Sequence, residues 1–177
     1  GHILPGGLDH ILFVLAIFLA ARRAASLIWQ ISAFTLAHTI TLALAATGLV
    51  SLPSSLVEPV IAFTIAFVAV ENLLFKDVVK WRPVVVFIFG LIHGLGFASF
   101  FSALDLPPGL FWSALIGFNI GVEVGQLGVV VLAAVAVRLC FKKPAQDVRY
   151  QKWIFRPGSA LIGLSGLWWG FSAALNL

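Results

Sequence analysis

Three carboxylates and three histidines fall within long apolar segments of this chain, where a polar side chain is costly to bury. Only 11 apolar residues separate His10 from Arg22, too few to cross a bilayer, so Asp9 and His10 must enter the membrane or its outer edge. The other polar side chains of interest in apolar segments are His38, Glu71, Asn72, His93, Asn119, Glu123 and Gln126. Histidines and carboxylates from several helices are typical ligands of a first-row divalent metal ion.

The charge of these acids needs a partner that the apolar segments do not contain. An ionised side chain at the centre of a membrane helix costs roughly 2.5–3.5 kcal/mol. All 11 lysines and arginines lie at the ends of these segments or between them, and only Glu71 is within reach of Lys76 or Arg82. The remaining options are protonation, a protonated histidine or a bound cation. The single cysteine, Cys140, excludes an intramolecular disulfide and a multi-cysteine metal site.

A structural role is the alternative for each of these residues taken singly. A lone histidine or asparagine in a membrane more often bonds a neighbouring helix than a metal ion. The i, i+4, i+7 spacing of Asn119, Glu123 and Gln126 places them on one helix face. Glycines at four-residue spacing predict close helix packing. They are Gly90, Gly94, Gly117, Gly121 and Gly125. For the whole set of acids and histidines, which lacks a basic partner, we favour a metal site.

The elements that must position these residues are transmembrane helices. The chain has 177 residues, of which 61% are hydrophobic and 10% charged, against about 45–50% and about 25% in soluble proteins. This composition excludes a soluble domain, a disordered chain, a coiled coil and a disulfide scaffold. The apolar runs lack the alternation of a membrane barrel, so we predict one all-α transmembrane helix bundle over residues 1–177. Its six expected spans are 7–24, 27–50, 56–75, 83–103, 110–137 and 157–177.

The basic residues indicate how the bundle is oriented in the membrane. All 11 lie in alternate loops, between spans one and two, three and four, and five and six. By the positive-inside rule these loops are cytoplasmic, so both termini are on the outer (periplasmic) side. The net charge of +4 therefore indicates topology, and we expect no nucleic-acid partner. Because the chain begins with Gly-His-Ile and has no methionine, an upstream segment, signal peptide or extra span stays open.

Five short motifs carry a resemblance that extends over nearly the whole chain. They include Gly-Gly-Leu-Asp-His, Leu-Ala-His-Thr, Ala-Val-Glu-Asn, Leu-Ile-His-Gly and Phe-Asn-Ile-Gly-Val-Glu. The matching stretches are residues 2–13, 34–42, 69–72, 89–98 and 118–126. With these motifs in this order, the chain resembles the HupE/UreJ family of bacterial membrane proteins.

The resemblance implies a multi-pass protein of the bacterial inner membrane that is a permease for nickel, or for cobalt. It implies an accessory role beside hydrogenase or urease, with nickel-enzyme maturation proteins as partners. It also implies that His2, Asp9 and His10 handle the metal. One departure is that Ile3 follows His2, whereas hydrogenase-linked members have a His-Pro pair. This difference places the chain in a broader branch of the family.

We favour transport of a divalent metal ion as the function. The expected metal ligands are His2, Asp9, His10, His38, His93 and Glu123. A secondary polar path is expected at Glu71, Asn72, Asn119 and Gln126. The first-span ligands form the outer entrance in this hypothesis. His38, His93 and Glu123 form the station in mid-membrane, and Glu71 with Asn72 forms the inner exit.

Two other functions stay open at this point. In an intramembrane hydrolase, three histidines and an aspartate hold zinc, and Glu71 or Glu123 acts as the base. In a structural subunit of a larger complex, the polar residues only pack, and no metal binds. Inverted repeats are not evident, which favours a channel-like path or an enzyme over an alternating-access transporter. A homo-oligomer is a further expected assembly.

Overall fold

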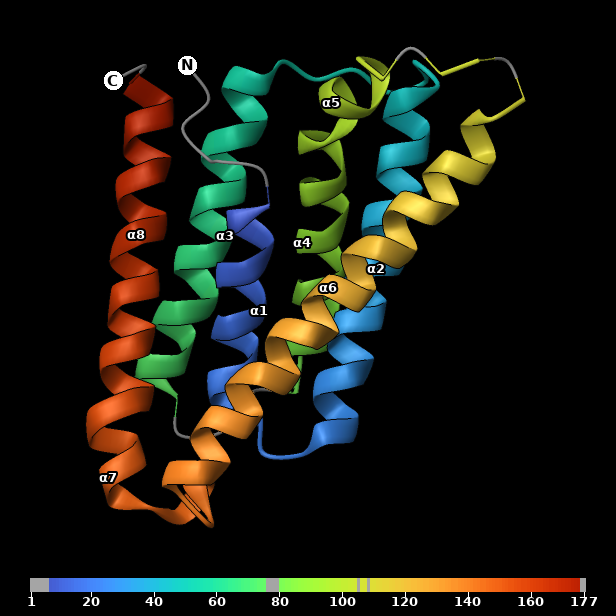
Figure 1. Cartoon of the computed structure of the whole chain (residues 1–177). Coiled ribbons are helices and arrows are strands. Elements are labelled where there is room, and N and C mark those ends of the chain that lie inside the picture. Colours follow the sequence, from blue (N-terminus) through green and yellow to red (C-terminus); the bar gives the residue numbers. More distant parts are fainter. Residues whose placement is uncertain (1–6, 76–79, 105, 108, 176–177) are drawn as a thin grey trace.

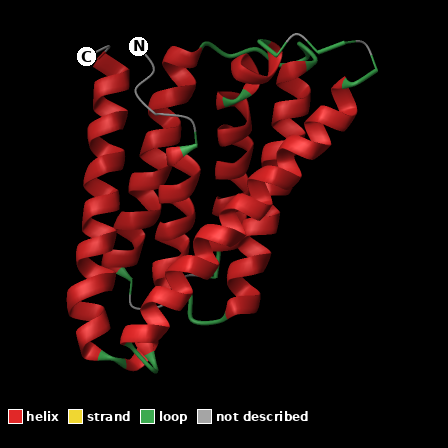
Figure 2. Ribbon diagram, in the orientation of Figure 1, coloured by secondary structure: helices red, strands yellow, loops and turns green. Residues whose placement is uncertain are grey.

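The structure is a computed structural model that describes residues 7–75, 80–104, 106–107 and 109–175. These residues form helices and no strand (Figures 1 and 2), which confirms the all-α bundle. The helices are α1 Leu8–Ala20, α2 Ala24–Ala46, α3 Ser54–Leu74, α4 Arg82–Gly96, α5 Ala98–Ser102, α6 Phe111–Cys140, α7 Val148–Tyr150 and α8 Arg156–Leu175. A 3₁₀ turn (Pro144–Gln146) precedes α7, and a π-helical segment (Gln151–Phe155) joins α7 to α8. Two residues named above lie outside the described residues: the expected metal ligand His2, and Lys76, a possible partner of Glu71.

Four helices of the described chain are long and apolar enough to cross a membrane, by length and composition. They are α2, α3, α6 and the continuous segment Val148–Leu175. Helices α1 and α4 are apolar but shorter, with 13 and 15 residues. At 1.5 Å per residue, α1 rises about 20 Å, less than the roughly 30 Å of a hydrocarbon core. Figure 1 shows α1 (blue) starting partway along α3, so its first turn lies inside the bundle.

The fourth expected span, 83–103, is divided in two. Helix α4 ends at Gly96, and the chain continues after Phe97 into the short α5. The sequence His-Gly-Leu-Gly-Phe explains the break, because each glycine inside a helix costs about 1 kcal/mol relative to alanine. Figure 1 shows α5 at the end of the bundle where α8 terminates. The break leaves His93 one turn from the end of α4.

Two helix pairs pack closely through glycines. A Cβ added at Gly90 would lie 2.5 Å from the Phe34 carbonyl oxygen, and one at Gly94 would overlap the His38 carbonyl, so α4 packs tightly on α2. A Cβ added at Gly166 would lie 2.8 Å from the Ala62 carbonyl oxygen, so α8 packs on α3 equally closely. Small residues allow such approaches between membrane helices. The packing predicted for Gly90 and Gly94 is therefore confirmed.

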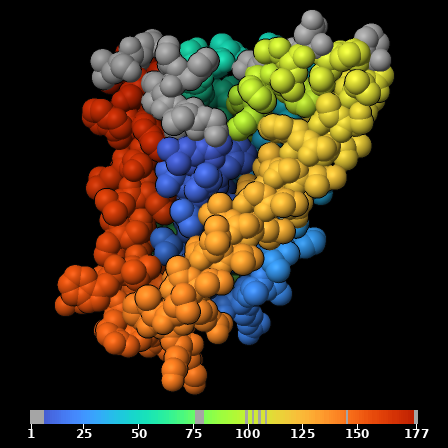
Figure 3. Space-filling model, viewed as in Figure 1, coloured from blue at the N-terminus to red at the C-terminus, as the bar shows by residue number. Residues whose placement is uncertain are grey.

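The same prediction is wrong for the glycines of α6. Nothing in the described chain lies within 4 Å of a Cβ added at Gly117, Gly121 or Gly125. Helix α6 (yellow to orange) runs obliquely across α1 and α2, so most of its length faces outward (Figures 1 and 3). Its exposed side chains are large and apolar, among them Ile116, Val124 and Leu132. Such a surface suits the hydrocarbon of a bilayer.

The described basic residues gather at one end of the bundle, opposite α5. Arg22 and Arg23 lie between α1 and α2, and six others lie from the last turn of α6 to the first residue of α8 (Figure 1). We call this the basic end. Arg82 differs from these residues in being buried, with a side chain that is only 1% exposed. Its Nε donates to Glu71 Oε2 at 3.2 Å, and its Nη2 bonds Asn72 Oδ1 and the Val68 carbonyl. The pairing that the sequence allowed between Glu71 and Arg82 is therefore present.

Candidate metal centre

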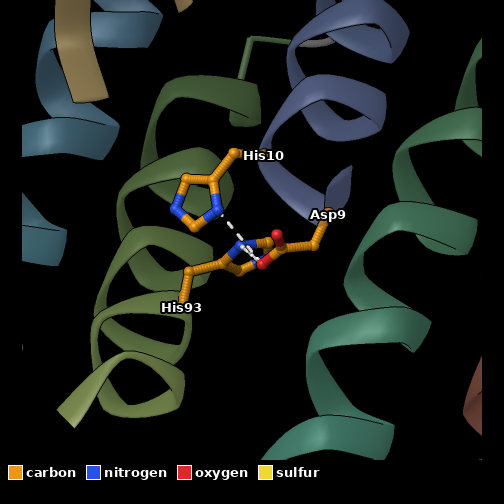
Figure 4. Close-up of side chains that lie close together, drawn as sticks. All are labelled: Asp9, His10 and His93. Carbon is orange, nitrogen blue, oxygen red and sulfur yellow. Dashed lines mark ion pairs between the residues drawn. The ribbon is translucent and has the colours of Figure 1, made fainter. Parts of the chain in front are cut away.

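Two adjacent residues of α1 meet a histidine of α4 inside the bundle. Asp9 and His10 are each 5% exposed, and His93 is fully buried. Oδ2 of Asp9 lies 3.1 Å from Nδ1 of His10 and 3.7 Å from Nδ1 of His93 (Figure 4). One potential ligand atom from each residue lies within 4.8 Å of the others. This carboxylate and two imidazoles have the composition of a first-row metal site.

A third histidine extends this group toward α2. The His10 ring centroid lies 5.1 Å from that of His38 and 5.2 Å from that of His93. Aromatic side chains border the group, because the ring centroids of Phe34 and Phe97 lie 5.5 and 5.0 Å from that of His10. His38 is fully buried. The structure therefore brings together four of the expected ligands, Asp9, His10, His38 and His93, and we call these four the histidine cluster.

The hydrogen bonds of Thr64 set the tautomer of His93. The Thr64 hydroxyl donates to the Ile61 carbonyl at 2.7 Å and lies 2.8 Å from Nε2 of His93. Because the hydroxyl has one proton and donates it to the carbonyl, its oxygen accepts the N–H of Nε2. Nδ1 of His93 then keeps its lone pair, on the side where Asp9 lies. Outer hydrogen bonds of this kind orient histidines that bind metals.

Asn119 of α6 does the same for His38. Its Nδ2 donates to the Leu115 carbonyl at 2.8 Å, which turns Oδ1 toward Nδ1 of His38 at 3.0 Å. An amide oxygen only accepts hydrogen bonds, so Nδ1 of His38 carries the proton. Nε2 of His38 is therefore the nitrogen with the lone pair. Asn119, expected on a secondary polar path, contacts a histidine of the cluster directly.

Four ring nitrogens in the histidine cluster are buried and make no hydrogen bond to the described residues. They are Nδ1 and Nε2 of His10, Nε2 of His38 and Nδ1 of His93, and of these Nδ1 of His10 is in ion-pair contact with Asp9. A buried polar group without a partner costs about 1–3 kcal/mol. For His93 and His38 the unpartnered atom is the one that the tautomer leaves with a lone pair. The cluster therefore presents electron pairs in a buried site, as a cation requires.

The structure places Glu123 and Gln126 apart from the histidine cluster, along the contact between α2 and α6. Glu123 Oε1 accepts a hydrogen bond from Ser32 at 2.7 Å, and Gln126 Oε1 accepts one from Thr35 at 3.2 Å. The shared face expected for Asn119, Glu123 and Gln126 thus faces α2. Of these three residues, Asn119 is the one bonded to a histidine.

Glu71 and Asn72 lie toward the basic end and are tied to Arg82. Asn72 also donates to the Ala16 carbonyl at 2.8 Å and to Ser159 at 3.4 Å, so it links α3, α1 and α8. The sequence pattern alone did not indicate the role of Thr64 or the burial of Arg82. Thr64 stands seven residues before Glu71, on the same face of α3, which is the signal that could have identified it.

Apolar layers close the histidine cluster on two sides. Toward the basic end, α1 after His10, and α2 and α4 before their histidines, contribute buried apolar side chains to a single core group. This group includes Phe13, Ile17, Ile31, Phe34, Val68 and Val86. Toward the opposite end, Leu42, Phe101 and Leu115 form a second group, with Phe97 and Phe118 packed against it. The cluster is therefore enclosed between two apolar layers.

The family model described as HupE / UreJ protein matches residues 1–173, nearly the entire chain. Comparison with curated proteins and with solved structures found no match. The match agrees with the apolar helices and with the buried Asp9, His10 and His93, which could bind a metal ion. The chain therefore belongs to the HupE/UreJ family of membrane proteins, which supports in general an accessory or transport role in nickel or cobalt handling.

Proposed function

We propose that this protein carries a divalent transition-metal ion, nickel or cobalt, across the bacterial inner membrane. The observation that supports this most is the histidine cluster, in which Asp9 adjoins two imidazole nitrogens without hydrogen-bond partners. Neutral imidazole with carboxylate suits nickel and cobalt better than calcium or magnesium. The ion is the substrate in this proposal and binds in passing.

The ion enters from the end of the bundle where α5 lies, past His2, Asp9 and His10. It is held by the histidine cluster and leaves toward the basic end past Glu71 and Asn72. The apolar layers on both sides of the cluster favour a gated path, in which helices move before the ion leaves. A membrane potential contributes about 2.3 kcal/mol per charge per 100 mV, twice that for a divalent ion.

A zinc-dependent hydrolase is the second candidate, because two histidines and an aspartate also suit catalytic zinc. Such an enzyme needs a base near the metal. Glu71 is paired with Arg82, and Glu123 is bonded to Ser32, so neither carboxylate joins the histidine cluster. This arrangement favours transport over hydrolysis.

The test is uptake of radioactive nickel by sealed proteoliposomes with an imposed potential. We expect uptake by the native protein, competition by cobalt, and loss of uptake in His93→Ala. Gln30→Ala is the matched control, because Gln30 is a buried polar residue of α2 that bonds only Ser26 among the described residues. Bound metal with no uptake in any variant would exclude transport and leave the enzyme.

A further inference from the structure

A large cavity opens among the basic residues at the end of the bundle opposite α5. Its volume is about 870 Å³, within the range of roughly 300–1,000 Å³ typical of ligand pockets. Parts of α1, α3, α6 and the segment before α8 line it. Apart from Arg82, the basic residues that line it are Arg22, Arg23, Arg138, Lys142, Lys143 and Arg156. We call it the basic cavity.

Five basic residues of the basic cavity have no carboxylate partner within the described chain: Arg23, Arg138, Lys142, Lys143 and Arg156. Glu71 is the only carboxylate among the residues that line it, and this carboxylate is already paired with Arg82. Arg82 lines the cavity with a side chain that is 1% exposed, and its Nη1 makes no hydrogen bond to the described residues. This buried guanidinium N–H is a donor that a phosphate oxygen can accept, because guanidinium pairs well with phosphate oxygens.

An apolar groove adjoins the basic cavity. It has a volume of about 500 Å³, and α1, α6 and the start of α8 line it. Its lining side chains, which include Leu15, Ala136 and Leu161, are uncharged, and all are apolar except for the Cys140 thiol. Phe18, Leu19 and Val137 line both the groove and the basic cavity. The basic cavity and the apolar groove are therefore adjacent and share lining residues.

We propose that the basic cavity and the groove together bind one anionic phospholipid. Its phosphate headgroup lies in the basic cavity, and an acyl chain lies along the groove. Basic pockets between membrane helices on the cytoplasmic side bind anionic headgroups. A free phosphate ion satisfies the basic cavity but leaves the groove unused, and the adjoining groove is the reason for choosing the lipid. Binding involves no metal, so the proposal stands apart from nickel transport.

The experiment is native mass spectrometry of the delipidated protein in detergent, titrated with phosphatidylglycerol or with phosphatidylcholine of the same chains. The variant Lys142→Gln/Lys143→Gln removes two charges that line the basic cavity. Arg149→Gln/Lys152→Gln is the matched control, because it removes two exposed charges between α6 and α8 that do not line the basic cavity. Ala136→Trp fills the groove without changing any charge.

We expect phosphatidylglycerol to bind in preference to phosphatidylcholine. Lys142→Gln/Lys143→Gln should bind it about thirtyfold more weakly, since each basic residue near an anionic lipid contributes roughly a factor of five. The control pair should bind as the native protein does, and Ala136→Trp should also weaken binding. Equal binding of both lipids, or equal loss in the two double variants, would overturn the proposal. So would displacement of the lipid by inorganic phosphate together with unchanged binding in Ala136→Trp, because the ligand would then be a phosphate ion.

Discussion

The side-chain oxygen of Asn119 lies 3.0 Å from Nδ1 of His38, across the contact between α6 and α2. This hydrogen bond leaves Nε2 of His38 as the free electron pair beside His10. Replacing Asn119 by leucine removes the acceptor, and we expect nickel affinity to fall by about 10–100-fold, as for other outer hydrogen bonds to metal ligands.

Gln126→Leu is the matched control for Asn119→Leu, because Gln126 lies on the same face of α6 but bonds Thr35. Nickel titration of both purified variants measures the difference. Equal losses in the two variants would show that this part of α6 acts only through packing.

Gly94 lets α4 pack closely against His38 of α2, whose side chain belongs to the histidine cluster. A Cβ at this position would overlap the His38 carbonyl and the Thr41 hydroxyl. We expect Gly94→Ala to lower the free energy of unfolding by about 1–3 kcal/mol and to weaken nickel binding, because α2 must shift. Gly121→Ala, where nothing lies within 4 Å, should unfold no more easily than the native protein. Thermal unfolding in detergent compares the two, and equal stability of both variants would contradict the packing described here.

The buried Arg82–Glu71 pair stabilises the helices near the basic end. Removing one partner of a buried ion pair costs about 3–5 kcal/mol, because the other charge is left uncompensated. We therefore expect Arg82→Met and Glu71→Leu each to be strongly destabilised, and the double variant to recover part of the loss. A double-mutant cycle in thermal unfolding measures this coupling. Additive losses would mean that the two side chains do not depend on each other.

The orientation of the bundle can be read from Cys140, the single cysteine of the chain, which is exposed near the basic end. The positive-inside rule predicts that this residue faces the cytoplasm. A membrane-impermeant maleimide should then label inside-out vesicles and leave intact cells unlabelled. Cys140→Ser with Ser51→Cys, in the loop between α2 and α3, should show the reverse pattern. Labelling of Cys140 in intact cells would reverse the predicted topology.

Much of the fold follows from the free-energy cost of placing charged or polar residues in an apolar helix. Six apolar runs between charges or turn residues correspond to the six longest helices of the described chain, α1, α2, α3, α4, α6 and α8. Asp9, His10, His38 and His93 could be singled out because each is costly in an apolar helix. The length of α1 could not be read in the same way. The expected span 7–24 continued through Arg22 and Arg23, but these side chains are exposed, and the helix ends at Ala20.

Contacts between helices were harder to anticipate. The spacing of Asn119 and Glu123 gives their common face, but it does not give the oblique crossing of α6 over α2. That crossing decides that Asn119 contacts His38 and that Glu123 contacts Ser32. Thr64 was missed because a threonine in an apolar helix usually bonds its own backbone. It does so here as well, and its contact with His93 depends on how α3 and α4 pack.

The central claim is that the histidine cluster binds a divalent metal ion. Elemental analysis by mass spectrometry, after incubation with nickel, cobalt or zinc and removal of free ions, tests it most directly. We predict about one ion per chain for the native protein and for Gln30→Ala, and loss of the ion in Asp9→Asn and His93→Ala. Exchangeable nickel or cobalt would support transport, and tightly held zinc would favour the hydrolase. No bound metal under any of these conditions, or equal metal in His93→Ala, would contradict the account.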